Sequence, residues 1–139
     1  MNKDGAIIIV EDDPDDKDII TQILSDIGMR NETITFSNGE EAYSHLTQSI
    51  SEPFIIISDI NMPKMNGIEL KNKIQIESGT KFLSVPFILM STAEPTDSII
   101  KKSTKSVQEY FKKPNNWQDY RKEIEGIIGF WSSSTQPIF

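Results

Sequence analysis

Ile55-Ile56-Ile57-Ser58-Asp59-Ile60-Asn61-Met62-Pro63 is a short apolar run that ends on a carboxylate and is followed by a turn marked by proline. Isoleucine runs of this length, bounded by turn residues, are typical of a buried strand. A carboxylate directly after such a strand lies at the carboxyl edge of an open α/β sheet, where ligands bind. Taken alone, Asp59 is equally well explained as a cap for the next turn, so its role depends on partners elsewhere in the chain.

Similar apolar runs recur along the chain and alternate with segments whose apolar residues have helical spacing. The first pattern is typical of strands and the second of amphipathic helices. Five repeats of the pair predict an α/β fold, in which helices cover both faces of one five-stranded parallel sheet. The expected strands are residues 6–10, 33–36, 54–58, 86–90 and 110–111, and the expected helices are residues 14–27, 39–50, 67–76, 95–106 and 117–131.

The predicted helices differ in how much apolar surface they offer. The fourth has little, and we therefore expect it to be the most mobile element. The last has a long apolar stripe, for which core packing or self-association is a better explanation than ligand binding. The residues expected to face the core are Ala42, Tyr43, Leu46 and Ile50 in the second helix, Ile99, Ile100 and Val107 in the fourth, and Trp117, Tyr120, Ile124, Ile127, Ile128 and Trp131 in the last.

Length, charge and composition exclude several classes of protein. The 139 residues suit one domain, and a net charge of −7 disfavours a nucleic-acid-binding face and favours a cationic partner or a metal ion. The absence of cysteine excludes disulfides, thiolate metal sites and cysteine nucleophiles. No apolar run approaches membrane-spanning length and residues 1–5 do not form a signal peptide, so we expect a cytoplasmic protein without membrane contact.

Polar residues follow four of the five predicted strands. The acidic run at residues 11–13 follows the first strand, Asp59 the third, Thr92 the fourth and Lys113 the fifth. Strands of a parallel sheet end at one edge, so these side chains are expected to meet there. Closely packed carboxylates repel and favour a bound cation, and hard oxygen ligands suit Mg²⁺, which favours phosphate-bearing ligands. The chemistry indicated is phosphoryl transfer, with Asp59 as the nucleophile that carries an acyl phosphate.

Other ionisable residues near these strands have simpler explanations. Asp15 and Asp16 begin the first helix, and we interpret them as solvated acids that complement its positive end. Asp13 stays open between a place beside the site and a solvated one. The single histidine, His45, is expected to be exposed, because a phosphotransfer histidine normally needs a helical bundle that this pattern does not offer.

Four segments together match a known family. They are Val10-Glu11-Asp12-Asp13-Pro14, Ser58-Asp59-Ile60-Asn61-Met62-Pro63-Lys64-Met65-Asn66-Gly67, Ser91-Thr92-Ala93 and Tyr110-Phe111-Lys112-Lys113-Pro114. The chain resembles the receiver domains of bacterial two-component response regulators, of the stand-alone, CheY-like kind that lacks an output domain. The resemblance implies a flavodoxin-like (βα)5 receiver fold. We expect a receiver domain at residues 1–131 and a flexible tail at residues 132–139.

The resemblance implies a role for each acidic residue of the site. Asp59 would accept a phosphoryl group from a sensor histidine kinase or a histidine phosphotransfer protein. Mg²⁺ would be bound by the carboxylates of Asp12 and Asp59 and by the backbone carbonyl of Asn61, while Glu11 would act through a metal-bound water. Phosphorylation would then switch the binding of a downstream protein, which the sequence does not identify.

The resemblance also assigns residues that respond to phosphorylation. Lys113 would pair with Asp59 and then with the phosphoryl group, and its bond to Pro114 would be cis. Thr92 would move to bond a phosphoryl oxygen, and Tyr110 would turn inward with it, although plain core packing also explains Tyr110. The output surface would comprise the fourth helix, fifth strand and fifth helix, and residues 107–111 are a candidate homodimer face.

Two alternatives stay open beside this signalling switch. An aspartyl-phosphate phosphatase would need a second acid at position 61, but Asn61 has no proton to exchange; Asn61 and Glu94 would instead tune hydrolysis of the acyl phosphate. A degenerate receiver that serves only as a binding scaffold is disfavoured by the intact site residues. Departures from the family at residues 103–109 and at Asn115 and Asn116 leave the geometry of the partner surface open.

Overall fold

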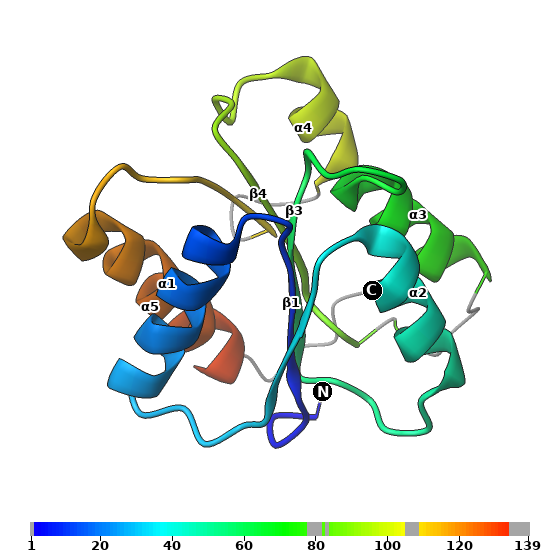
Figure 1. Cartoon of the computed structure of the whole chain (residues 1–139), viewed down its shortest axis with the longest axis horizontal. Coiled ribbons are helices and arrows are strands. Elements are labelled where there is room, and N and C mark those ends of the chain that lie inside the picture. Colours follow the sequence, from blue (N-terminus) through cyan, green and yellow to red (C-terminus); the bar gives the residue numbers. More distant parts are fainter. Residues whose placement is uncertain (1, 78–81, 83, 105–108, 134–139) are drawn as a thin grey trace.

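The computed structural model describes residues 2–77, 82, 84–104 and 109–133, and these form an α/β fold (Figure 1). Five parallel strands make one sheet in the order β2-β1-β3-β4-β5. The predicted fold class is confirmed. The strands are β1 (Ile7–Val10), β2 (Thr33–Phe36), β3 (Ile55–Asp59), β4 (Phe87–Ser91) and β5 (Tyr110–Lys112).

The first helix begins and ends at residues that favour helix termini. The side chain of Asp13 accepts a hydrogen bond from the backbone amide of Asp15 at 2.9 Å and so caps the first helix, which begins at Pro14. Gly28 follows that helix with a φ of 85°, a conformation that costs glycine little. The helices are α1 (Pro14–Asp26), α2 (Gly39–Gln48), α3 (Gly67–Glu77), α4 (Ser98–Ser103) and α5 (Trp117–Ser133).

Helices cover both faces of the sheet. α1 and α5 lie on one face, and α2 and α3 lie on the other (Figure 1). Successive strand residues point to opposite faces, so Ile7 and Ile9 enter the core beneath α1 and α5, while Ile8 and Val10 enter the core beneath α2 and α3. Burial on both faces explains why β1, β3 and β4 are mostly apolar runs, whereas the edge strand β2 is only partly buried and alternates threonine with apolar residues.

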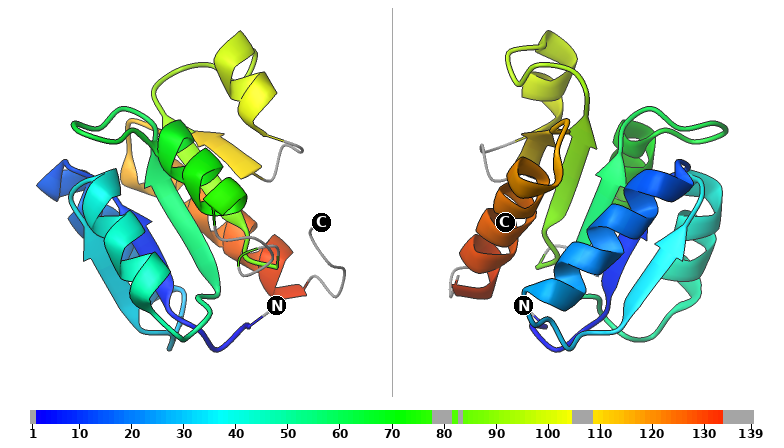
Figure 2. Two further views of the ribbon diagram at one scale, coloured as in Figure 1. Left: turned by 90° about the vertical axis from the view of Figure 1, so that its right-hand side faces the viewer. Right: turned by 60° about the vertical axis from the view of Figure 1, so that its left-hand side comes forward.

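The helix α4 is shorter than the expected span of residues 95–106. It starts after Asp97, whose side chain accepts a hydrogen bond from the backbone amide of Ile99 at 2.9 Å. Ile100 is its one buried residue, and Ile99, expected to face the core, is 61% exposed. Both views in Figure 2 place α4 beyond the end of β4, apart from the other helices. Residues 105–107, including the expected core residue Val107, lie outside the described residues.

The ends of α2 and α5 also differ from the expectation. α2 stops at Gln48, so Ile50 lies beyond the helix and is 99% exposed, whereas the sequence placed it on the inner face. α5 continues to Ser133, two residues past the expected domain boundary. The remainder of the predicted tail, residues 134–139, lies outside the described residues.

The apolar stripe of α5 is confirmed except at its first residue. Tyr120, Ile124, Ile128 and Trp131 are buried against the sheet, whereas Trp117 is partly exposed where the helix begins. The remaining predicted member, Ile127, is buried as well. None of the described helices combines the length and the apolar character needed to cross a bilayer.

Candidate functional site

A carboxylate cluster forms where β1 and β3 end side by side. Val10 pairs with Ser58 across these strands, and the residues that follow them, Glu11 and Asp59, come together at the carboxyl edge of the sheet. Glu11 is fully buried and Asp59 is 5% exposed, whereas Asp12 is exposed. One carboxylate oxygen from each of Glu11, Asp12 and Asp59 lies within 4.8 Å of the other two.

A lysine that follows β5 compensates part of this charge. The Nζ atom of Lys113 lies 2.9 Å from Oε2 of Glu11, 3.2 Å from Oδ2 of Asp16 and 3.3 Å from Oδ2 of Asp59. The three ammonium protons therefore have three carboxylate acceptors. The order of the strands explains the convergence, because β1, β3, β4 and β5 are neighbours and all four end at this edge.

The electrostatics of the cluster favour a further positive charge. Burial raises the pKa of Glu11 to about 7, and the hydrogen bond from Lys113 offsets only part of that effect. Burial also raises the pKa of Asp59, although Lys113 opposes the shift. Burial alone would lower the pKa of Lys113, but its hydrogen bond to Glu11 and the charges of its carboxylate neighbours raise it. The ammonium stays charged and does not fully balance the carboxylates.

The donor set fits a divalent cation. Three carboxylates offer oxygen atoms close enough to share one ion, and hard oxygen ligands are the ones that Mg²⁺ and Mn²⁺ prefer. Asp12 and Asn61 are exposed, so water molecules can complete the coordination of an ion there. A cation would also relieve the cost of burying Glu11 and Asp59 in charged form.

Backbone contacts shape the turn that follows β3. The amide of Asn61 donates to Oδ1 of Asp59 at 3.4 Å, and the amide of Gly67 donates to the carbonyl oxygen of Ile60 at 3.0 Å. A Cβ atom on Gly67 would overlap the carbonyl oxygen of Asp59, which explains glycine at this position. The path of the turn beside Asp59 therefore does not depend on the side chain of Asn61.

Thr92 and Tyr110 are linked through the segment that leaves β4. Thr92 is exposed and directly follows β4, which pairs with β3. Tyr110 is buried, and its hydroxyl donates to the carbonyl oxygen of Ala93 and lies 3.0 Å from Oγ of Ser91. Tyr110 is thus hydrogen-bonded to both neighbours of Thr92, so a shift of this segment changes the surroundings of the ring.

Two expectations about the neighbours of the site were wrong. Asp16 is not a solvated helix-start acid, because it accepts a hydrogen bond from Lys113; no local signal in the sequence distinguishes it from its neighbour Asp15. The Lys113–Pro114 bond is trans, not cis. The trans form is the lower in energy by about 0.5–1 kcal/mol, and Lys113 reaches its three acceptors with it.

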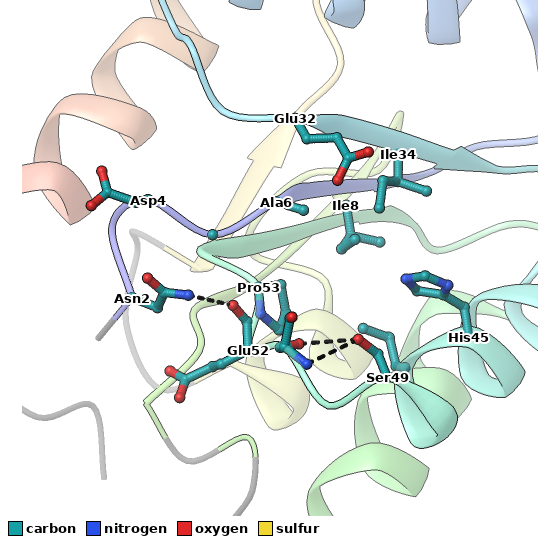
Figure 3. Close-up of a pocket in the computed structure, with 13 residues that line it drawn as sticks. Asn2, Asp4, Ala6, Ile8, Glu32, Ile34, His45, Ser49, Glu52 and Pro53 are labelled. Carbon is teal, nitrogen blue, oxygen red and sulfur yellow. Dashed lines mark hydrogen bonds between the residues drawn. The ribbon is translucent and has the colours of Figure 1, made fainter.

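A cavity of about 370 Å³ lies at the opposite edge of the sheet (Figure 3). Ala6 and Pro53, just before β1 and β3, line it together with His45 of α2. His45 was expected to be exposed, but it is partly buried there, with its ring centroid 5.2 Å from that of Phe36. Because this cavity lies at the amino ends of the strands, it is separate from the carboxylate cluster.

Comparison with known proteins identifies the family. A family model described as the response regulator receiver domain matches residues 7–125. The chain belongs to this family. Receiver domains act in phosphorelay signalling and interact with histidine kinases or phosphotransfer proteins; they are not enzymes in the usual sense. The response regulator Rcp1 of Synechocystis sp. is 27% identical over 135 residues, which cover 94% of this chain and 90% of Rcp1.

Solved receiver structures have the same architecture. The phosphorylated cyanobacterial phytochrome response regulator RcpA superposes with a TM-score of 0.79 at 28% identity, covering 96% of this chain and 97% of RcpA. The Mn²⁺-bound form of response regulator Rcp1 superposes with a TM-score of 0.76 at 25% identity, covering 96% of this chain and 98% of Rcp1. The receiver fold expected from the sequence is confirmed.

Proposed function

We propose that this receiver domain accepts one phosphoryl group on Asp59 and changes its protein partners as a result. One observation carries the proposal: Asp59 ends the central strand β3 within a cluster of three carboxylates, with the Lys113 ammonium 3.3 Å from its Oδ2. The described part of the chain holds no second cluster of this kind. A carboxylate in this setting is a nucleophile that can carry an acyl phosphate.

The proposed cofactor is Mg²⁺. Asp12 and Asp59 would hold it through their carboxylates, Asn61 through its backbone carbonyl, and Glu11 through a metal-bound water. When bound, the ion would neutralise carboxylate charge and orient phosphoryl oxygens. The fit of the carboxylate cluster supports this assignment, and so does the Mn²⁺-bound structure of the relative Rcp1.

The proposed reaction is an in-line phosphoryl transfer. A carboxylate oxygen of Asp59 forms a bond to the phosphorus of a phosphohistidine on a sensor kinase or phosphotransfer protein, while the P–N bond breaks. The electron pair leaves on the imidazole nitrogen, which takes a proton from water. Lys113 neutralises charge on the phosphoryl oxygens, because its ammonium already lies beside Oδ2 of Asp59. Water later hydrolyses the acyl phosphate, at a rate that Asn61 and Glu94 would tune.

The proposed switch runs through Thr92 and Tyr110. Thr92 would turn its hydroxyl toward a phosphoryl oxygen on the neighbouring strand end. Tyr110 would respond because its hydroxyl is bonded to Ser91 and Ala93 on either side of Thr92. Tyr110 belongs to β5, so the change would reach the surface formed by α4, β5 and α5, where a downstream protein or a second copy of the chain would bind.

The function is tested by mass spectrometry of the intact protein. After incubation with acetyl phosphate and Mg²⁺, we expect one added phosphoryl group on the wild type and none when EDTA replaces Mg²⁺. Release of inorganic phosphate from phosphate esters over many turnovers would instead support a phosphatase. A wild-type protein that gains no phosphoryl group from acetyl phosphate or from phosphoramidate would contradict the proposal.

The switch predicts a local change in hydrogen exchange. Beryllofluoride, which mimics the phosphoryl group, should change amide exchange in α4 and β5 by at least about three-fold, because few buried side chains hold α4 in place. The strands β1 and β2 serve as the internal control and should exchange at unchanged rates. Unaltered exchange throughout α4 and β5 would reject this output surface while leaving the phosphorylation site intact.

A further inference from the structure

Lys113 contacts three carboxylates, and one of them, that of Asp16, belongs to a helix and not to a strand end. Asp16 lies in the first turn of α1, and its Oδ2 is 3.2 Å from Nζ of Lys113. The side chains are 11% exposed for Lys113 and 23% exposed for Asp16, so this contact is shielded from solvent for the most part. An ion pair of this kind is stronger than one on an open surface.

Asp16 does not belong to the carboxylate cluster. Among the residues that the structure describes, the acids whose oxygens could share one cation are Glu11, Asp12 and Asp59. Lys113 therefore has two kinds of partner. Glu11 and Asp59 contact the ammonium and are also members of the carboxylate cluster. Asp16 contacts the ammonium but is not a member of the cluster.

Buried aromatic side chains lie close to the strand end from which Lys113 extends. Tyr120 of α5 is buried, with its ring edge-on to Phe111 of β5 at a centroid distance of 6.1 Å. The Tyr120 hydroxyl is buried without a hydrogen-bond partner among the described residues. Burial raises the pKa of Tyr120, and the negative charge of Asp16 raises it further. Such surroundings strengthen the attraction between Asp16 and Lys113.

We infer that Asp16 is a positioning residue that keeps the Lys113 ammonium beside Asp59 while a divalent cation occupies the carboxylate cluster. The inference rests on the proposed function. A cation bound beside Glu11 and Asp59 would weaken their attraction for Lys113 and would also repel the ammonium. Asp16 lies outside the cluster, so its hold on Lys113 persists, and the ammonium stays in place for the phosphoryl oxygens.

Loss of charge and loss of positioning at Asp16 should change the rate of phosphorylation in opposite directions, which makes the inference testable. Removing a negative charge near Asp59 reduces repulsion of an anionic phosphodonor and, by itself, would speed phosphorylation. Loss of positioning would slow it. Asp15→Asn is the matched control, because Asp15 is the exposed neighbour of Asp16 in the same helical turn and makes no ion pair with Lys113.

The experiment measures the rate of phosphorylation by acetyl phosphate at saturating Mg²⁺. Asp16→Asn should slow it by at least about five-fold, and Asp15→Asn should change it by less than about two-fold. Asp16→Glu keeps the carboxylate and should restore at least about half of the wild-type rate, because the lysine side chain can follow it. Circular dichroism and thermal unfolding report on folding, and Asp16→Ser replaces Asp16→Asn if that variant does not fold.

The outcomes separate this inference from the function on which it rests. If the wild type is phosphorylated on Asp59 but Asp16→Asn reacts as fast as Asp15→Asn or faster, Asp16 has no positioning role and the proposed function stands. If Asp16→Glu is as slow as Asp16→Asn although both are folded, positioning by the carboxylate is also overturned. If the wild type is not phosphorylated at all, the proposed function and the inference both fall.

Discussion

Asp59→Asn should reduce phosphorylation by acetyl phosphate to less than about 1% of the wild-type level, because an amide oxygen is not a nucleophile for phosphoryl transfer. The measurement is the fraction of protein that gains one phosphoryl group at saturating Mg²⁺. The same substitution should raise the thermal stability, since burial raises the pKa of Asp59 and makes its charged form costly at neutral pH. Lost reactivity with retained or raised stability would separate loss of the nucleophile from misfolding.

Asp18→Asn provides the matched control for this experiment. Asp18 is an exposed acid of α1 that lies outside the carboxylate cluster and makes no ion pair with Lys113. Its substitution should leave the extent of phosphorylation unchanged. Stoichiometric phosphorylation of the Asp59→Asn protein would show that another side chain is the acceptor, and peptide mapping would then locate it.

Lys71→Met should lower the free energy of unfolding by about 3 kcal/mol, the largest loss of stability that we expect from a single substitution outside the apolar core. The Nζ atom of Lys71, on α3, lies 3.5 Å from Oε1 of Glu109 and donates to the carbonyl oxygen of Ser103 at the end of α4. Both charged side chains are buried, so removing the lysine takes away a buried ion pair with Glu109 and a hydrogen bond to the backbone of Ser103. Urea unfolding at neutral pH gives the measurement.

The same helix supplies the control for this substitution. Lys73→Met removes an exposed ammonium that lies 4.0 Å from Glu77 and should cost less than about 1 kcal/mol. The double variant Lys71→Met/Glu109→Gln should recover part of the lost stability, because it also removes the buried carboxylate charge that Lys71 offsets. Equal unfolding free energies for Lys71→Met and Lys73→Met would show that the buried pair contributes nothing to stability.

Periodicity and strand-end chemistry predicted the fold and most of the site from the sequence. Isoleucine runs such as that of β3 are buried on both faces of the sheet, and a short apolar run of this kind is typical of a strand in a covered parallel sheet. Because parallel strands end at one edge, the sequence could place Glu11, Asp59 and Lys113 together without coordinates. The roles of these residues came from the resemblance to receiver domains, and the experiments above test them.

The missed features depend on three-dimensional neighbours. Asp16 has the local pattern of any helix-start acid, and only the approach of Lys113 from a distant strand distinguishes it. Lys71 resembles a surface lysine on α3, and its partner Glu109 lies 38 residues further along the chain. Ile50 lies beyond the end of α2, and Ile99 lies on the exposed side of α4; hydrophobic periodicity alone indicates neither where a helix ends nor how much of it is covered.

The turn after β3 separates two properties of residue 61, namely the position of its backbone carbonyl and the identity of its side chain. Its path is held by main-chain contacts at Ile60 and Gly67 and by the amide of Asn61, so the backbone carbonyl of residue 61 is positioned without a hydrogen bond from the Asn61 side chain to any described residue. Binding of a metal ion by this carbonyl would stay the same when the exposed side chain at position 61 is replaced. Under the proposed function, replacing this side chain would change the lifetime of the acyl phosphate and leave the backbone ligand of the metal site in place.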